Sequence, residues 1–231
     1  MFHCLHVLLE AIVGIWGVVL KKSLVFLMLI FLPIAAYAAE PQQERPFWSF
    51  EAKGGNFTPT LADWKQFYDS RSMPEYGVAL SYKLLRQVEF GIEAGTMFAK
   101  GHAFAPLHGI TTGSVTYDLY PANAFILLRG IVSEDQWLVP YVGGGFTRMY
   151  YQEKVEGQGT VRGSADGYHY RGGLQFLLDG LDSDASNNMY LDYGVYHTYF
   201  FVEAEKTSAI VKSVSVNLGG TAYLMGLLFE F

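Results

Sequence analysis

The sequence predicts an all-β fold: a transmembrane antiparallel up-and-down β-barrel of about eight strands that follows an N-terminal signal peptide. Three observations lead to this prediction. The chain begins with an export leader, the segments after it alternate apolar and polar side chains with period two, and its last residues are apolar at every second position. No stretch past residue 38 is apolar over the roughly 20 residues that a membrane-spanning helix needs.

The first 38 residues end in the layout of a cleavable signal peptide. Two lysines precede an apolar run at 23–35, and a small-x-small triplet ends at Ala38. We therefore predict cleavage between Ala38 and Ala39. This divides the chain into an N-terminal extension and signal peptide over 1–38 and one barrel domain over 39–231.

A second apolar run lies ahead of the two lysines. One interpretation is an over-extended start site, with true initiation near Val18, Val19 or Leu20. The other is a membrane anchor. The run Leu5–Leu20 is short for a span and contains Glu10, which favours the first interpretation.

Composition excludes several classes of function. The formal net charge is −6 and no Lys/Arg run is present, so a nucleic-acid partner is not expected. The one cysteine, Cys4, lies in the leader, and the predicted domain can form neither a disulfide nor a thiolate metal site. The histidines after the leader lack the spacing of metal ligands, although His102 and His108 share one predicted loop. We predict no metal and no cofactor.

Eight segments carry the two-residue alternation that predicts strands. They run over 48–53, 76–84, 88–95, 114–131, 137–151, 168–176, 189–196 and from about 210 to the end. Proline cannot donate to a strand ladder, so a bulge or break is expected near Pro121, and this leaves the strand count open.

The sparse polar face of these segments favours a barrel in lipid over a secreted β-sandwich. A sandwich turns its polar faces to water and should carry many charges there. Here that face is mainly Gly, Ser and Ala, as a narrow barrel interior requires. Trp48, Trp137 and several tyrosines near segment ends are expected to form the interfacial girdles.

The C-terminus carries the sharpest pattern. Its apolar positions are Tyr223, Met225, Leu227, Phe229 and Phe231. This pattern resembles the C-terminal signal of outer-membrane proteins that the barrel assembly machinery reads. The remaining interpretation is an edge strand of a soluble sheet.

The predicted domain as a whole resembles the small outer-membrane barrels of the outer-membrane protein W and X type. The segment from Trp137 to Gly145 is similar to a fifth-strand motif common in those families. The resemblance implies eight antiparallel strands in the outer membrane of a Gram-negative envelope, with both termini in the periplasm. It also implies the lipid bilayer and the barrel assembly machinery as partners. The longer outer loops would be Thr58–Glu75, Lys100–Gly109, Gln152–Arg162 and Glu203–Ala209.

Several charged residues fall on the predicted interior face. These are Glu51, Lys53, Lys83, Glu89, Glu93, Asp118, Arg171 and Asp192. Charges inside a barrel are costly unless they are paired. The favoured interpretation is a structural plug of ion pairs, and the alternatives are a gated narrow channel, a path for a small polar ligand and, last, catalytic carboxylates.

One enzyme family needs separate comparison. Lipid A deacylases are also eight-stranded outer-membrane barrels, and they use a late-strand His two residues before a nucleophilic Ser. This chain reads His197-Thr198-Tyr199, so the Ser is missing and Thr198 falls on the opposite face. No catalytic site is predicted.

The sequence therefore favours an integral outer-membrane barrel with a structural, adhesive or envelope-integrity role and no catalytic activity. A narrow pore or carrier for small molecules is the alternative. A lipid A-modifying enzyme is the second, disfavoured alternative. The residues predict neither a ligand nor the partners of the loops.

Overall fold

The computed structural model describes residues 45–61, 64–68, 70–105, 110–133, 136–157, 159–211 and 215–231. The predicted leader, its cleavage site at Ala38 and Ala39, and His108 lie outside the described residues.

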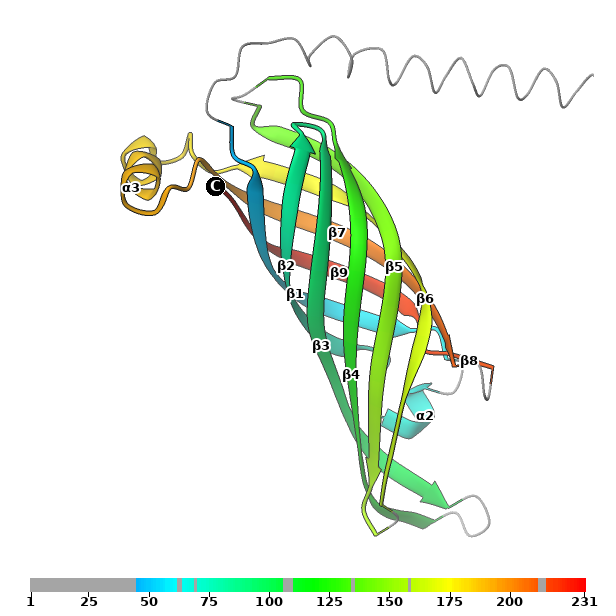
Figure 1. Ribbon diagram of the computed structural model, residues 1–231. Coiled ribbons are helices and arrows are strands. Elements are labelled where there is room, and N and C mark those ends of the chain that lie inside the picture. Colours follow the sequence, from blue (N-terminus) through cyan, green and yellow to red (C-terminus); the bar gives the residue numbers. More distant parts are fainter. Residues whose placement is uncertain are drawn as a thin grey trace, which may run out of the picture. The chain divides into compact units, whose positions relative to one another are not determined.

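The described chain forms one antiparallel sheet that closes into an eight-stranded barrel (Figure 1). The barrel strands are β1 (Trp48–Pro59), β2 (Met73–Leu85), β3 (Val88–Ala105), β4 (Ile110–Arg129), β5 (Leu138–Val155), β6 (Gly159–Leu177), β7 (His197–Val211) and β9 (Gly220–Glu230). A two-residue strand, β8 (Val216–Asn217), pairs with the end of β7, and two short helices, α2 (Trp64–Tyr68) and α3 (Ser183–Tyr193), lie in connections. Pairing of β6 with β7 and of β1 with β9 completes the ring.

The two ends of the barrel differ. At the terminal end, Trp48 and Phe231 exchange two backbone hydrogen bonds of 2.8 and 3.0 Å, a tight turn at 86–87 joins β2 to β3, and α3 connects β6 to β7. At the opposite, loop end, β3 to β6 continue past their neighbours (Figure 1). These four strands have 18, 20, 18 and 19 residues, about twice the 9–11 that cross a bilayer.

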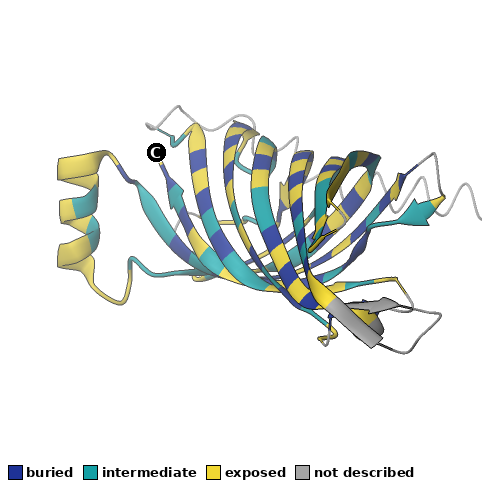
Figure 2. Ribbon diagram, turned by 90° about the horizontal axis from the view of Figure 1, so that it is seen from below, coloured by how far each residue is buried: buried dark blue, intermediate teal, exposed yellow. Residues whose placement is uncertain are grey.

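Burial alternates along each strand, as Figure 2 shows by its dark and yellow stripes. In β4 every odd position from Val115 to Arg129 is buried, and the even positions are exposed or intermediate. One face of the sheet therefore fills the interior and the other faces outward.

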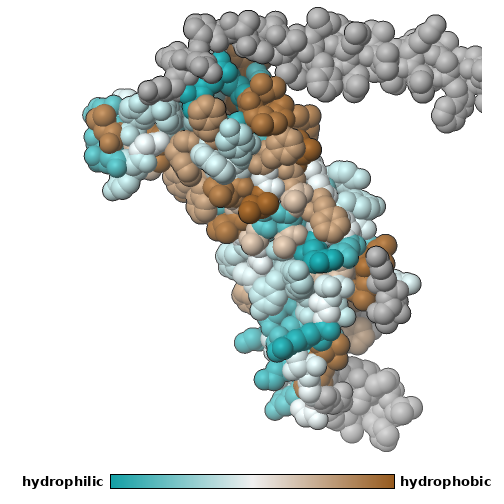
Figure 3. Space-filling model, in the orientation of Figure 1, coloured by the Kyte–Doolittle hydropathy of each residue, from teal (hydrophilic) through white to brown (hydrophobic). Residues whose placement is uncertain are grey.

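The outward face carries an apolar band on the half next to the terminal end, seen as brown in Figure 3. Aromatic pairs edge it there: the rings of Trp48 and Tyr82 are 5.1 Å apart, and those of Trp137 and Phe176 are 6.2 Å apart. Toward the loop end the band gives way to outward-facing charges. Such a band is what lipid contact requires, and its aromatic edge suits a membrane interface.

Helix α3 corrects the prediction of a strand at 189–196. The side chain of Asp182 accepts a hydrogen bond of 2.9 Å from Ala185 N, which caps the start of the helix. Gly194, with φ of 69°, ends it in the left-handed conformation. The seventh barrel strand begins instead at His197. Within the described part of the chain, no helix is long and apolar enough to cross a membrane.

Strand β4 corrects the prediction of a break near Pro121. The strand runs unbroken over 20 residues, and Pro121 stays paired with Met149 of β5. On the other side, the ladder with β3 skips Gly95 and Thr96 and then resumes in the same register. Gly95 leaves room for the ring, because a Cβ there would lie 3.1 Å from Pro121 Cγ. A gap in the β3–β4 ladder thus accommodates Pro121, which has no backbone N–H to donate.

Three of the expected loops are largely strand. In Gln152–Arg162, β5 continues to Val155 and β6 begins at Gly159. Glu203–Ala209 lies inside β7, paired with β6 on one side and partly with β9 on the other. Strand β3 extends to Ala105, so much of Lys100–Gly109 is also paired. In β7 the side chains of Glu203, Glu205 and Thr207 face the barrel interior, and Lys206 faces outward.

A glycine in β5 tests how tightly the strands approach one another. Gly145 faces the interior, and a Cβ there would lie 1.9 Å from the Ala124 carbonyl oxygen of β4. Gly145→Ala should therefore lower the free energy of unfolding by about 1–3 kcal/mol, the usual cost of overpacking. Urea titration of the barrel folded in lipid vesicles measures this. Gly180→Ala is the control, because no atom lies within 4 Å of that Cβ, and equal stability of the two variants would contradict the argument.

Candidate functional site

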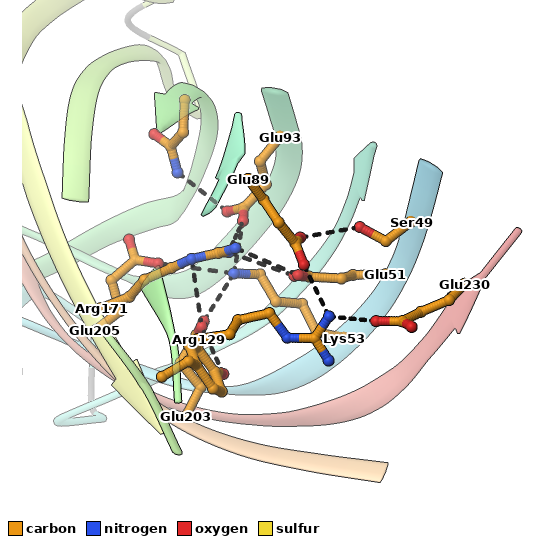
Figure 4. Close-up of polar contacts among 12 residues, drawn as sticks. Ser49, Glu51, Lys53, Glu89, Glu93, Arg129, Arg171, Glu203, Glu205 and Glu230 are labelled. Atoms are coloured by element: carbon orange, nitrogen blue, oxygen red, sulfur yellow. Dashed lines mark hydrogen bonds and ion pairs between the residues drawn. The ribbon is translucent and has the colours of Figure 1, made fainter. Parts of the chain in front are cut away.

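The barrel interior brings together six of the eight charged residues predicted to lie there. All six are buried: Glu51, Lys53, Lys83, Glu89, Glu93 and Arg171. They form two groups at different heights, and Figure 4 shows both. The central group surrounds Lys53 and Arg171, and the terminal group surrounds a further arginine, Arg129.

Lys53 on β1 is the first cation of the central group. Its Nζ lies 2.7 Å from Glu93 Oε2 and 3.0 Å from Glu203 Oε1, on strands β3 and β7. Glu205 Oε2 is 3.7 Å away. One ammonium group thus joins three strands across the lumen.

Arg171 on β6 is the second cation. Its guanidinium contacts Glu93 at 3.0 Å, Glu51 at 3.3 Å and Glu203 at 3.5 Å. The same group lies over the ring of Phe125, with Cζ 3.8 Å from the ring centroid. Arg171 therefore shares two carboxylates with Lys53.

Neutral side chains complete the central group. Asn123 Nδ2 donates to Glu93 at 3.0 Å, and the Tyr141 hydroxyl donates to Glu203 at 2.9 Å. These hydrogen bonds satisfy lone pairs that the cations leave open, which a buried ion pair needs.

The terminal group is built on Arg129, at the end of β4. Its Nη1 contacts Glu89 Oε1 at 2.8 Å and also bonds Glu230, which pairs in turn with Lys83. The Ser49 hydroxyl donates to the other oxygen of Glu89 at 3.1 Å. Two cations and two carboxylates balance here.

Two predicted interior residues lie elsewhere. Asp118 is on the outward face of β4, because Tyr117 and Leu119 take the interior positions, one residue out of phase with the predicted faces. Asp192 lies exposed in α3, because its segment is helical. Both assignments to the interior were wrong.

Five further charged residues in the interior were not predicted from the sequence: Glu75, Arg129, Glu203, Glu205 and Glu230. Glu230 lies between Phe229 and Phe231, so the C-terminal alternation itself points it inward. Glu203 and Glu205 continue the alternation of Tyr199 and Phe201, which the assignment of this segment to a loop concealed.

The loop end of the lumen is filled by apolar side chains. Helix α2 is folded into the mouth, where Trp64 and Tyr68 stack at 4.0 Å and both contact the ring of Tyr117. Below them Met73, Met97, Leu119 and Met149 are each at most 2% exposed. This apolar plug lies on top of the central charged group.

The histidines do not assemble a site. His169 is buried against the ring edge of Phe125, and His197 Nδ1 lies 2.7 Å from Asp179 Oδ2 at the terminal end. Thr198 follows on the opposite side of β7, as strand geometry requires. No group of three or more His, Cys, Asp or Glu among the described residues is arranged to hold a metal ion.

Comparison with solved structures finds other proteins with this fold. Neisserial surface protein A is similar with a TM-score of 0.53 and 9% identity, over 80% of this chain and 97% of that one. The outer membrane protein OprG from Pseudomonas aeruginosa has a TM-score of 0.53 and 12% identity, over 83% of this chain and 99% of that one. No protein-family model and no curated protein matches the sequence.

The ion-pair group can be tested with two arginines on neighbouring strands. Arg171→Met leaves buried carboxylates without their cation and should lower the free energy of unfolding by about 3–5 kcal/mol. Arg148→Met is the control, because Arg148 pairs with Asp166 on the partly exposed outer face. Urea unfolding in lipid vesicles should show a large loss for the first variant and little for the second. Equal losses would contradict a plug that stabilises the barrel.

Similarity at these identities shows the fold alone, and that fold agrees with the expected resemblance. The closed-barrel fold is shared with solved outer-membrane proteins, and the outward face of this chain carries an apolar band, which together give the location. The chain is an integral β-barrel of the bacterial outer membrane.

Proposed function

We propose that this protein is a sealed, non-catalytic barrel that anchors a surface-exposed sheet in the outer membrane, with a structural or adhesive role. The observation that carries the proposal is the filled lumen. The terminal group, the central group and the apolar plug follow one another along the barrel axis, and the side chains in each are buried.

The lengths of the strands support a role at the loop end. Strands β5 and β6 pair in continuous register from Leu138↔Phe176 to Val155↔Gly159, beyond the apolar band. Pairing of β6 with β7 stops at Asp166↔Ile210, so the part of β6 beyond it pairs with no strand on that side among the described residues. A protruding sheet with a free edge suits contact with other surface molecules.

The direction of the chain in the membrane is part of the proposal. The tight turn and both ends of the described chain lie at the terminal end, and the protruding strands lie at the other. Outer-membrane barrels have short periplasmic turns and longer extracellular segments. We therefore assign the terminal end to the periplasm, and with it the pattern from Tyr223 to Phe231 as the signal for barrel assembly.

Ion conductance tests the sealed lumen. The folded protein inserted in a planar lipid bilayer should give no steady conductance, because displacing the central group would separate buried ion pairs. A general porin in the same bilayer is the positive control. Regular single-channel steps that change in Arg171→Met would contradict the proposal and favour the narrow pore.

Adhesion tests the protruding sheet. Replacing Gln152–Arg162 with Asn-Gly leaves Tyr151 and Gly163 paired across a two-residue turn that strand twist favours. Cells that express this shortened barrel should adhere less to epithelial monolayers than cells with the full chain. Gel mobility with and without boiling checks that both barrels fold. Undiminished adhesion would show that the protruding sheet is not adhesive, and a role in envelope integrity would then remain.

A further inference from the structure

A cavity at the loop end shares Trp64, Tyr68, Met73 and Tyr117 with the apolar plug. Its volume is about 420 Å³, within the range of small-molecule sites. It occupies the part of the mouth that α2 leaves open, because α2 lies against β3: a Cβ on Gly101 would lie 2.0 Å from the Phe67 carbonyl oxygen. The opposite wall comes from β5, β6, β7 and the β8 segment.

Aromatic rings form much of the cavity wall. The described residues that line it include Trp64, Phe67, Tyr68, Tyr117 and Tyr151. Their ring faces carry partial negative charge, which attracts cations that have shed their water. All but one of the remaining uncharged lining residues are apolar, so the cavity suits an apolar body: Pro59, Leu61, Met73, Val161, Val211, Val216 and Leu218.

Glu153 is the one charged residue among those described as lining the cavity. It faces inward on β5, in register with Tyr117 on β4 and Val161 on β6. Burial, followed by the carboxylate of Glu153, raises the pKa of Tyr68, so that hydroxyl keeps its proton beside the carboxylate. No Lys or Arg lines the described wall to neutralise Glu153.

We propose that this cavity binds a small organic cation: an aromatic or aliphatic body of modest size that carries a protonated amine. The ammonium group pairs with Glu153 among the tyrosine rings, and the apolar body packs against the aliphatic wall. Anions such as phosphates and free fatty acids are disfavoured by the same carboxylate. The inference does not depend on whether the lumen conducts or the sheet adheres.

Matched probes test the charge. Phenethylamine, protonated at neutral pH, and the uncharged 2-phenylethanol share the ring and the chain length. Calorimetric titration of the full folded protein in non-ionic micelles, corrected for the heat with empty micelles, should show saturable binding of the amine. Its dissociation constant should be at least about tenfold below that of the alcohol, because only the amine pairs with the carboxylate.

Three variants separate charge from packing. Glu153→Gln should weaken amine binding about tenfold and leave alcohol binding unchanged. Phe67→Ala, at a half-exposed ring, should weaken both probes. Asp192→Asn makes the same change of charge on exposed α3 and should alter neither. Heat-modified gel mobility shows that each variant folds.

Two results would overturn the proposal. The first is equal affinity for amine and alcohol that Glu153→Gln does not change, which leaves an apolar cavity without cation recognition. The second is no saturable binding of the amine to the folded wild-type protein.

Discussion

Closure of the backbone ladder is the constraint on which the rest of the structure depends. Strand β9 pairs with β1 on one side and β7 on the other, and Trp48 and Phe231 complete the seam at the terminal end. In lipid every backbone polar group needs a partner, so a sheet left open would expose a costly edge. Closure in turn divides each strand into an inward and an outward face. The interior of an eight-stranded ring is narrow, and its side chains must fill it.

The narrow interior also determines how its side chains are paired. Charged side chains in the interior cannot reach bulk water, so each needs partners on other strands. Lys53 and Arg171 meet this need by sharing Glu93 and Glu203, which ties β1, β3, β6 and β7 together across the lumen. A buried group of this kind adds less net stability than its short distances suggest, because desolvation offsets the attraction. The group has a larger effect on the stability of variants that lose one partner. It also fixes the strand register, because a slip of one residue would turn these charged side chains toward lipid.

The sequence predicted the barrel, many of the outward apolar positions and six interior charges, because period two is a direct property of strands. The faces predicted for Val115, Tyr117 and Leu119 were reversed. The prediction from sequence was wrong where a local feature, such as a helix cap or a proline, outweighs the two-residue alternation. Alternation at 189–196 is also compatible with a capped helix, and the signals that decide for α3 are Asp182 before it and Gly194 after it. Pro121 suggested a break, but one gapped ladder opposite Gly95 accommodates it. The partners of Lys53 could not be predicted, because they depend on which strands face each other across the ring rather than on neighbours in the chain.

The barrel thus separates two environments along one set of strands. The same alternation that places ion pairs inside and apolar side chains outside near the terminal end continues past the membrane in β3 to β6. There the outward side chains no longer need to be apolar, and inward ones need not be tightly packed. Tyr151 and Glu153 occupy inward positions at that height, where space remains beside α2. Recognition of other molecules is therefore most consistent with the loop end, because there the inward face of the sheet leaves room for a ligand.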